Sequence, residues 1–344
     1  DLGRGFIEDE ELPPMSLNGR VGVVCTKAQG RYVWTGELDR GVIDGYETFD
    51  VRAAGEWVDG VGLTIDRFST TRPGYRVEGS GTVVDGGPAN IVFKAEGTDL
   101  AYFWNHFELP PVGGSMAVTG HLEGPLDDFQ VNLNGGVRDL VWEFTEVDSG
   151  TVQAEVRRVG TLAPEVTLSL SGRHARVYGR PVDNPTLLMD IDTSSVRVHG
   201  VRVTRGDSAF VADFDVTTRG RNSRIALKHA AIETPFETWE TVGPAVIHAS
   251  DEGVAFDSLV FASARGEFGV SATRRVLEKR IDAHVWGRNV ALEVFRDALR
   301  LPIALEGRST FDLRLEGDED NPRLRLSAEM ARGRVDSLIV DAMR

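Results

Sequence analysis

The sequence predicts an all-β fold: an elongated antiparallel sheet, built from repeats, with one apolar face and one polar face. Three observations lead to this expectation. Strand-length segments alternate between apolar and polar residues, a strand–turn–strand cassette recurs, and only three short segments have helical spacing. A sheet with one apolar face needs something to cover that face.

The alternation runs through most of the 344 residues. Apolar side chains occupy every second position, and the positions between them are mostly Arg, Asp, Thr, Ser, His and Glu. This two-residue period places one face of a strand in an apolar environment and the other in water. Segments 61–83, 196–218 and 254–273 each indicate an antiparallel hairpin around a glycine. Clear alternating pairs are Leu63/Ile65, Ile91/Phe93, Leu168/Leu170, Val196/Val198, Val201/Val203, Leu259/Phe261 and Leu313/Leu315.

The recurring cassette has a Leu-Pro pair, a glycine in the following turn, a strand that ends in Leu-x-Gly, and a proline near an acidic turn. Its two full copies contain Leu109, Pro110, Gly114, Leu122, Gly124 and Pro125, and Leu301, Pro302, Gly307, Leu315, Gly317 and Pro322. A third Leu-Pro pair, Leu12-Pro13, precedes Gly19. The same unit of structure is therefore expected more than once in the chain.

The leucines of these pairs lie 109 − 12 = 97 and 301 − 109 = 192 residues apart, and the second gap is about twice the first. A copy is therefore expected near residue 205, but Val201–Asp207 has the pattern of a plain strand, so this copy has diverged. We expect residues 1–344 to form a single repeat array with approximate repeats 1–108, 109–204, 205–300 and 301–344.

Three segments predict short helices. Two of them have an N-cap residue followed by an apolar stripe and end just before a Leu-Pro, where proline stops a helix. The stripes are Leu100, Phe103, Trp104 and Phe107 after Asp99, and Ala291, Val294, Phe295 and Ala298 after Asn289. The third segment, Thr234–Glu237, is a capping box that would present Phe236 and Trp239. These few helices cannot cover a long sheet. The apolar face must therefore be covered in one of three other ways: by a second sheet in a sandwich, by closure into a barrel, or by a ligand held in a curved trough.

Charge and composition exclude several functions. The net charge of −15 disfavours a nucleic acid as partner, because such binding needs clustered Lys and Arg. The only cysteine, Cys25, excludes an internal disulfide and a multi-thiolate metal site. No segment approaches the roughly 18 apolar residues of a membrane-spanning helix. The first residues and the short run Leu338–Val340 resemble interrupted units, which predicts an internal segment of a longer protein.

No motif predicts an enzyme or a cofactor. The seven histidines lack metal-ligand spacing, and Gly79-Ser80-Gly81 is preceded by Glu78 where a nucleophile elbow has glycine. The acidic turn 318–321 lacks the glycine and distal glutamate of a calcium loop. The carboxylate pairs Asp190/Asp192 and Asp213/Asp215 have the spacing of an exposed polar strand face, although a glycosidase cleft would also use such pairs.

The cassette and the alternating strands resemble the TamB/AsmA-like superfamily, and most closely the repetitive middle region of a TamB-like protein. This resemblance implies a long sheet curled into a half-pipe, or β-taco, with a hydrophobic groove. It implies a periplasmic location and a role in moving phospholipid between the inner and outer membranes during outer-membrane biogenesis. It also implies an inner-membrane anchor and an Omp85-type outer-membrane barrel as partners, both through regions that flank this segment.

The lipid-binding hypothesis follows from the apolar lining that the resemblance implies. Each methylene group of an acyl chain that leaves water contributes about 0.8 kcal/mol, while the charged headgroup stays in water at the open seam. The candidate lining residues are Val131, Leu133, Leu168, Val198, Phe214, Phe256, Phe261, Leu313 and Leu326. Ordinary core packing is the other interpretation of each residue.

Two alternatives remain open at this stage. The chain could be a structural or adhesive β-repeat scaffold that binds protein partners without lipid. A carbohydrate-active β-solenoid would need aromatic residues and carboxylates in one groove, whereas the six tryptophans are scattered along the sequence.

Overall fold

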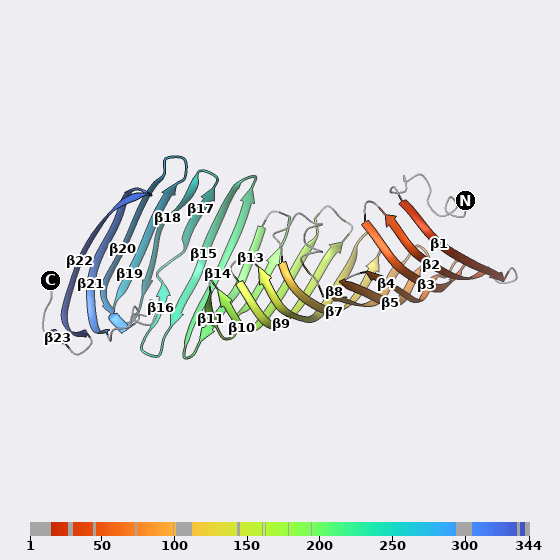
Figure 1. The fold of residues 1–344 in the computed structure, drawn as a ribbon, viewed down its shortest axis with the longest axis horizontal. Coiled ribbons are helices and arrows are strands. Elements are labelled where there is room, and N and C mark those ends of the chain that lie inside the picture. Colours follow the sequence, from red (N-terminus) through yellow and green to blue (C-terminus); the bar gives the residue numbers. More distant parts are fainter. Residues whose placement is uncertain are drawn as a thin grey trace. The chain divides into compact units, whose positions relative to one another are not determined.

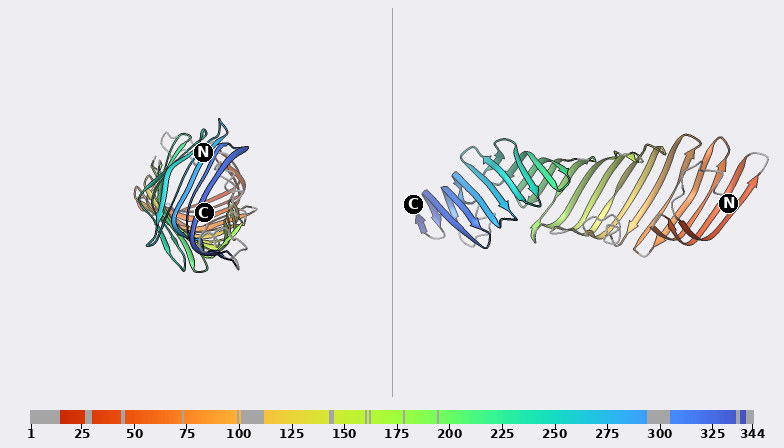
Figure 2. Two further views of the ribbon diagram at one scale, coloured as in Figure 1. Left: turned by 90° about the vertical axis from the view of Figure 1, so that its left-hand side faces the viewer. Right: turned by 90° about the horizontal axis from the view of Figure 1, so that it is seen from above.

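The computed structural model describes residues 15–26, 30–43, 46–72, 74–98, 100, 112–142, 145–159, 161, 163–177, 179–193, 195–293, 305–335 and 338–340. These residues form 23 strands, in agreement with the expected all-β fold. The chain divides into an N-terminal unit, Asp1–Val166 with Arg176–Arg180, and a C-terminal unit, Thr167–Ala175 with Pro181–Arg344. Figures 1 and 2 show the succession of curved strands in each unit.

The N-terminal unit is a meander in which each strand pairs antiparallel with the next along the chain. Its strands are β1 (Met15–Thr26), β2 (Arg31–Ile43), β3 (Tyr46–Val58), β4 (Gly62–Arg72), β5 (Tyr75–Val84), β6 (Pro88–Gly97), β7 (Val112–Pro125), β8 (Phe129–Trp142) and β9 (Thr145–Val159). Strand β10 (Glu165–Val177) has residues in both units.

The C-terminal unit continues the same antiparallel pattern. Its strands are β11 (Arg180–Val182), β12 (Thr186–Ile191), β13 (Ser195–Arg205), β14 (Ser208–Arg219), β15 (Asn222–Glu233), β16 (Thr238–Thr241), β17 (Ala245–Ser250), β18 (Gly253–Ala262), β19 (Glu267–Arg275), β20 (Arg280–Ala291), β21 (Leu305–Asp318), β22 (Asn321–Val335) and β23 (Leu338–Val340). Both short strands β16 and β17 pair with β15 on one side and β18 on the other.

The expected hairpins are confirmed. Strands β4 and β5 meet at Gly74, β13 and β14 at Gly206, and β18 and β19 near Gly266. Gly74 and Gly206 have φ values of 92° and 55°, which an L-residue with a side chain rarely adopts. The plain strand expected over Val201–Asp207 is present only as far as Arg205, because Gly206 and Asp207 form the turn between β13 and β14.

The two described cassettes have the same backbone geometry. Gly114 and Gly124 both have a φ of 113°, and their counterparts Gly307 and Gly317 have 117° and 119°. Each pair is 10 residues apart, and a register shift falls beside the first glycine in both copies. The Leu-Pro pairs themselves lie outside the described residues. The cassette is therefore a repeated piece of structure, while the proposed repeat boundaries stay a prediction.

β-Bulges explain why the alternation changes phase within several strands. In β13 the register shifts between Val198 and Val201, and in β18 it shifts between Phe256 and Leu259. Each bulge adds one residue, so the apolar residues on both sides of it face the same way. A bulged strand also bends, which gives a physical cause for the curvature of the strands in Figure 1.

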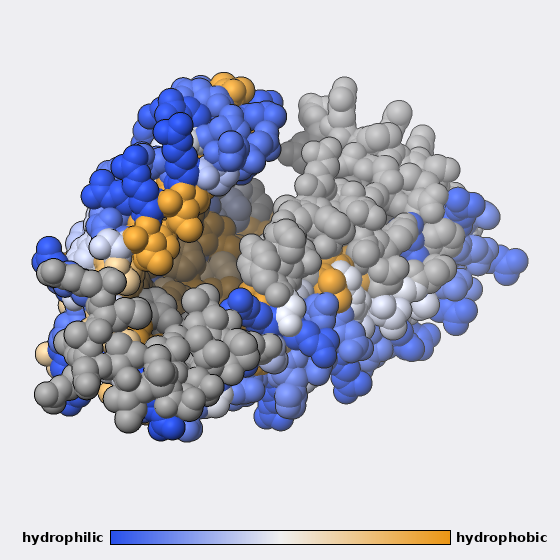
Figure 3. Space-filling view, turned by 60° about the vertical axis from the view of Figure 1, so that its left-hand side comes forward, coloured by the Kyte–Doolittle hydropathy of each residue, from blue (hydrophilic) through white to orange (hydrophobic). Residues whose placement is uncertain are grey.

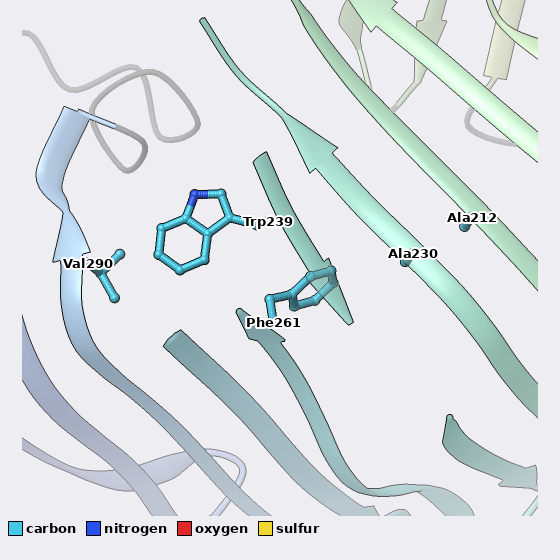
Figure 4. Packing of buried hydrophobic residues seen from close by; sticks show 5 residues of the cluster. All are labelled: Ala212, Ala230, Trp239, Phe261 and Val290. Atoms are coloured by element: carbon cyan, nitrogen blue, oxygen red, sulfur yellow. The ribbon is translucent and has the colours of Figure 1, made fainter. Parts of the chain in front are cut away.

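A buried cluster lies on the apolar face of the C-terminal unit. Trp239 and Val290 are 0% exposed, and Phe261 is 5% exposed. The ring of Phe268 stacks on Phe261 at 5.0 Å and lies 5.2 Å from the ring of Trp239. Figure 4 shows the indole between β16 and β20, with Ala212 and Ala230 on neighbouring strands. This cluster is the core of the unit.

Two helix predictions need correction. Asn289 does not cap a helix: it lies within β20 at a bulge with a φ of 52°, a conformation that asparagine tolerates, and the described helical residues begin at 292. Thr234 accepts the expected capping hydrogen bond from the Glu237 N–H, but a turn follows and then strand β16. Of the helix expected after Asp99, only Leu100 lies within the described residues; it is helical and buried.

Candidate functional site

The register of the C-terminal unit places apolar side chains in a continuous row across ten strands. Directly paired residues of an antiparallel sheet lie on the same face, so the row can be followed from strand to strand. The row consists of Ile191, Val196, Val216, Ile225, Ile247, Phe256, Ala272, Ala283, Leu315 and Leu324. Neighbouring strands are about 4.8 Å apart, so the row runs roughly 40 Å along the sheet.

Most of this row is only half-buried, in contrast to the sealed cluster around Trp239. All ten side chains of the row are hydrocarbon. Leu324, at the β22 end of the row, is 62% exposed. The space-filling view shows hydrophobic side chains gathered in a hollow of the C-terminal unit (Figure 3). The apolar face of this unit therefore has a packed part, the cluster, and an accessible part, which we call the open row.

The N-terminal unit has a similar row on its own apolar face. Ile65, Gly81, Ile91, Leu122, Val131 and Val156 are paired in succession from β4 to β9. The next row holds Phe68, Gly79, Phe93, Gly120, Leu133 and Ala154. Glycines opposite large side chains leave room for those side chains to lie flat on the sheet.

All nine predicted lining residues lie on the apolar face of their unit. Val131 and Leu133 lie in the two rows of the N-terminal unit, and Leu168 faces away from Thr167, whose hydroxyl bonds to Asp190 on the polar face. Phe256 belongs to the open row, and Val198, Phe214, Leu313 and Leu326 lie in the next row. Phe261 belongs to the cluster. Their contact with lipid stays a prediction.

The nine residues differ in how much of each side chain is exposed to solvent. Val198 and Phe261 are each 5% exposed, so they are packed within the protein. Leu326 is 64% exposed on β22, and the remaining six are half-buried. Sequence alone could not make this distinction, because the alternation fixes only the face on which a residue lies.

The opposite face of the C-terminal unit carries polar side chains that bond to one another, most of them across neighbouring strands. His199 bonds to Asp190 at 2.7 Å, His284 to Asp312 at 2.8 Å, and Lys228 pairs with Asp215 at 2.7 Å. The hydrogen bond from His199, followed by that from Thr167, holds the pKa of the Asp190 carboxyl below its usual value. These carboxylates have partners within the sheet, so the glycosidase interpretation of the Asp pairs has no support here.

Charged side chains also gather at the hairpin tips that border the open row. Arg221 pairs with Asp251 at 2.9 Å, Arg275 with Glu278 at 3.2 Å, and Arg274 with Glu319. Backbone hydrogen bonds join neighbouring tips, since Val276 N–H donates to Glu252 O and Glu319 N–H donates to Lys279 O, both at 2.8 Å. The open row thus lies next to a polar margin.

The other ends of these strands carry a more buried ion pair. The Glu237 side chain is 8% exposed and receives hydrogen bonds from Arg308 at 3.2 Å and from the Ser263 hydroxyl at 2.8 Å. Arg308 also donates to the backbone oxygen of Asn289 at 2.9 Å. Sequence reasoning missed this network and the burial of Trp239, because the residues that contact one another here are 19 to 71 positions apart in the sequence.

The described residues lack two features that would indicate other functions. They contain no group of three or more His, Cys, Asp or Glu side chains arranged to hold a metal ion. They also contain no helix that is long and apolar enough to cross a membrane. Comparisons with protein-family models, with curated proteins and with solved structures found no match for the chain.

Proposed function

We propose that the chain binds lipid acyl chains along the open row of its apolar face. The observation that carries this proposal is the row of ten apolar side chains, which the register holds continuous across bulges and hairpins. A half-buried apolar surface of this length gains free energy when hydrocarbon replaces water, by about 25 cal/mol for each Å² covered.

The uniformity of the row suits a sliding ligand. The hydrocarbon core of a bilayer is about 30 Å thick and contains two leaflets, so one acyl chain extends roughly 15 Å. The open row is more than twice that length, and its Val, Ile, Leu, Ala and Phe side chains offer similar contacts along it. An acyl chain could therefore occupy many positions of nearly equal free energy.

The wider function extends this proposal. We propose a bridge-like lipid-transport protein of the periplasm, which carries phospholipid between the inner and outer membranes and contributes to outer-membrane biogenesis. The resemblance of the cassette to TamB-like proteins supports this, together with the apolar rows in both units. An inner-membrane anchor and an Omp85-type barrel are the proposed partners, through regions outside this segment.

The first test asks what the purified protein carries. Organic extraction followed by mass spectrometry is expected to identify phospholipid bound to the unaltered chain. Val216→Asp places a charge in the open row and is expected to remove most of that lipid, because burying an unpaired carboxylate against hydrocarbon is strongly unfavourable.

A matched control is available on the same strand. Val211 lies on the opposite face of β14 from Val216 and is also half-buried, so Val211→Asp is expected to keep its lipid. Equal loss in both variants would point to general destabilisation. A folded, lipid-free unaltered protein would contradict the proposal and favour a protein-binding scaffold.

A further inference from the structure

One tryptophan stands on the polar face of the C-terminal unit. Strand β20 places Trp286 on the same face as His284 and Arg288, opposite to the apolar rows. Register pairs Trp286 with Gly269 on β19 and with Asp312 on β21. The two-residue alternation predicts a polar side chain at position 286, so the packing of the apolar face gives no reason for this indole.

The indole lies against the neighbouring strand. A Cβ at Gly269 would collide with the Trp286 ring system, so the ring occupies the space that a side chain at residue 269 would need. Glycine within a strand allows this close approach. Gly269 is buried beneath the ring, while Trp286 itself is half-buried, so part of the indole remains open to water.

A hollow of about 450 Å³ opens beside the indole, across three strands of the polar face. The polar-face residues that line it are His284, Trp286 and Arg288 of β20, Thr310 and Asp312 of β21, and Ser327 and Glu329 of β22. The hollow spans roughly 10 Å, since neighbouring strands are about 4.8 Å apart. Small-molecule sites have volumes of about 300–1,000 Å³, so this hollow is large enough for one.

The ion pairs at the border of the hollow leave hydrogen-bonding capacity for a ligand. Asp312 accepts a hydrogen bond from His284 at 2.8 Å, and Arg288 donates to Glu267 at 2.9 Å. The Arg288 guanidinium carbon lies 5.4 Å from the centre of the indole. The side chains of Asp312 and Arg288 are 47% and 72% exposed, and exposed pairs of this kind contribute little net free energy. Both groups can therefore bond to a ligand at little loss.

Hydrogen-bond donors and acceptors both surround the indole. Arg288 donates, Asp312 and Glu329 accept, and the hydroxyls of Thr310 and Ser327 do either. The two carboxylates repel a phosphate or another anion, and a purely apolar ligand would leave the polar border without partners. An uncharged ligand with hydroxyls at its edge and an apolar face satisfies both the border and the indole.

A pyranose sugar with equatorial substituents has this form, because its C–H groups lie on the two faces of the ring and its hydroxyls radiate from the edge. We propose that the hollow beside Trp286 binds an uncharged saccharide built from such pyranose units, with a sugar face on the indole and hydroxyls bonded to Asp312 and Arg288. The hollow lies on the opposite face of the sheet from the open row, so this inference does not depend on lipid binding.

The test titrates the chain with cellohexaose and with chitohexaose, two uncharged chains of such sugars, in isothermal titration calorimetry. The unaltered chain is expected to bind at least one of them. Trp286→Ala is expected to weaken that binding roughly tenfold or more, since the apolar area that the sugar covers is lost. Trp286→Phe keeps an aromatic ring and is expected to give an intermediate affinity.

A second variant is needed, because Trp286→Ala also removes the cover of Gly269. Asp312→Asn keeps the indole and the size of the side chain, and is expected to lower the affinity roughly three- to tenfold through loss of a charge-assisted hydrogen bond. Phe236→Ala is the matched control, since Phe236 is a 63% exposed aromatic residue of the same unit that lies outside the hollow. Circular dichroism verifies that each variant is folded.

Each outcome decides a different point. An unaltered chain that binds neither saccharide overturns the inference, and so does unchanged affinity in either folded hollow variant. Equal loss of affinity in Phe236→Ala would show non-specific contact with exposed aromatic residues and would also overturn it. Lipid retention by Trp286→Ala should equal that of the unaltered chain, so the saccharide site and the proposed lipid binding stand or fall separately.

Discussion

The ring of Phe93 lies over Gly120 on the neighbouring strand and fills the space where a side chain at residue 120 would stand. The two residues are directly opposed, β6 to β7, within one row of the N-terminal unit. The large side chain thus lies flat against the backbone of its neighbour, and the glycine is required by the ring above it.

Gly120→Ala is expected to destabilise the N-terminal unit by about 1–3 kcal/mol, because the added methyl group displaces the Phe93 ring. Denaturant unfolding, followed by fluorescence or circular dichroism, measures the change. Gly36→Ala is the control, since nothing lies within 4 Å of a Cβ at that position of β2. Equal effects in the two variants would refute the steric explanation.

Trp239→Ala is expected to destabilise the C-terminal unit by about 3–5 kcal/mol, since it empties a fully buried site beside Phe268 and Val290. Phe236, three residues earlier, is 63% exposed, so Phe236→Ala should change stability by less than about 0.5 kcal/mol. Thermal unfolding of both variants compares them, and similar losses would show that Trp239 is not the packed residue of the pair.

Arg308→Ala is expected to cost about 3 kcal/mol, because it leaves the buried Glu237 carboxylate without its cation. Arg314→Ala breaks a pair whose side chains are 52% and 47% exposed, and should cost less than about 1 kcal/mol. The Arg308→Ala/Glu237→Gln double variant should recover part of the loss. Urea titration measures these three variants and the single Glu237→Gln variant. A double variant whose loss equals the sum of the two single losses would argue against coupling.

Stability is expected to fall as the pH drops below about 4. Hydrogen bonds from His199 and Thr167 lower the pKa of Asp190, and His284 and Arg314 lower that of Asp312. A carboxyl with a depressed folded-state pKa stabilises the fold above its unfolded pKa, near 3.9, and loses that contribution as the pH falls through the folded value. Melting temperatures against pH should show a shallower fall for Asp190→Asn than for Asp257→Asn, a control on the polar face. Identical curves would contradict this role of Asp190.

The two-residue alternation was enough to predict the all-β fold and the face of each lining residue. The alternation also changes phase where a bulge lies. Val196/Val198 and Val201/Val203 are out of phase by one residue, and the register shift in β13 lies between these two pairs. Residue patterns of this kind are local, and a strand's face is decided locally.

The features of the structure that the sequence did not predict depend on residues far apart in the chain. Thr234 makes its capping contact, yet Thr238–Thr241 pair with β15 and β18, and this strand pairing overrides the local helical signal. Asn289 is likewise held in a bulge by its bonds to Thr310 and to Arg265 O. The difference between buried Phe261 and exposed Leu326 also depends on distant partners, since Phe261 packs in the cluster with Trp239 and Val290.

The meander has a consequence for how such a chain can change in evolution. Among the residues that the structure describes, strands β4 to β9 each bond only to the strands before and after them in the sequence. Removal or duplication of a whole hairpin at its tips therefore keeps every remaining register, and leaves each apolar row continuous. The reach of the sheet can grow or shrink in steps of two strands through recombination, without a new fold having to be found.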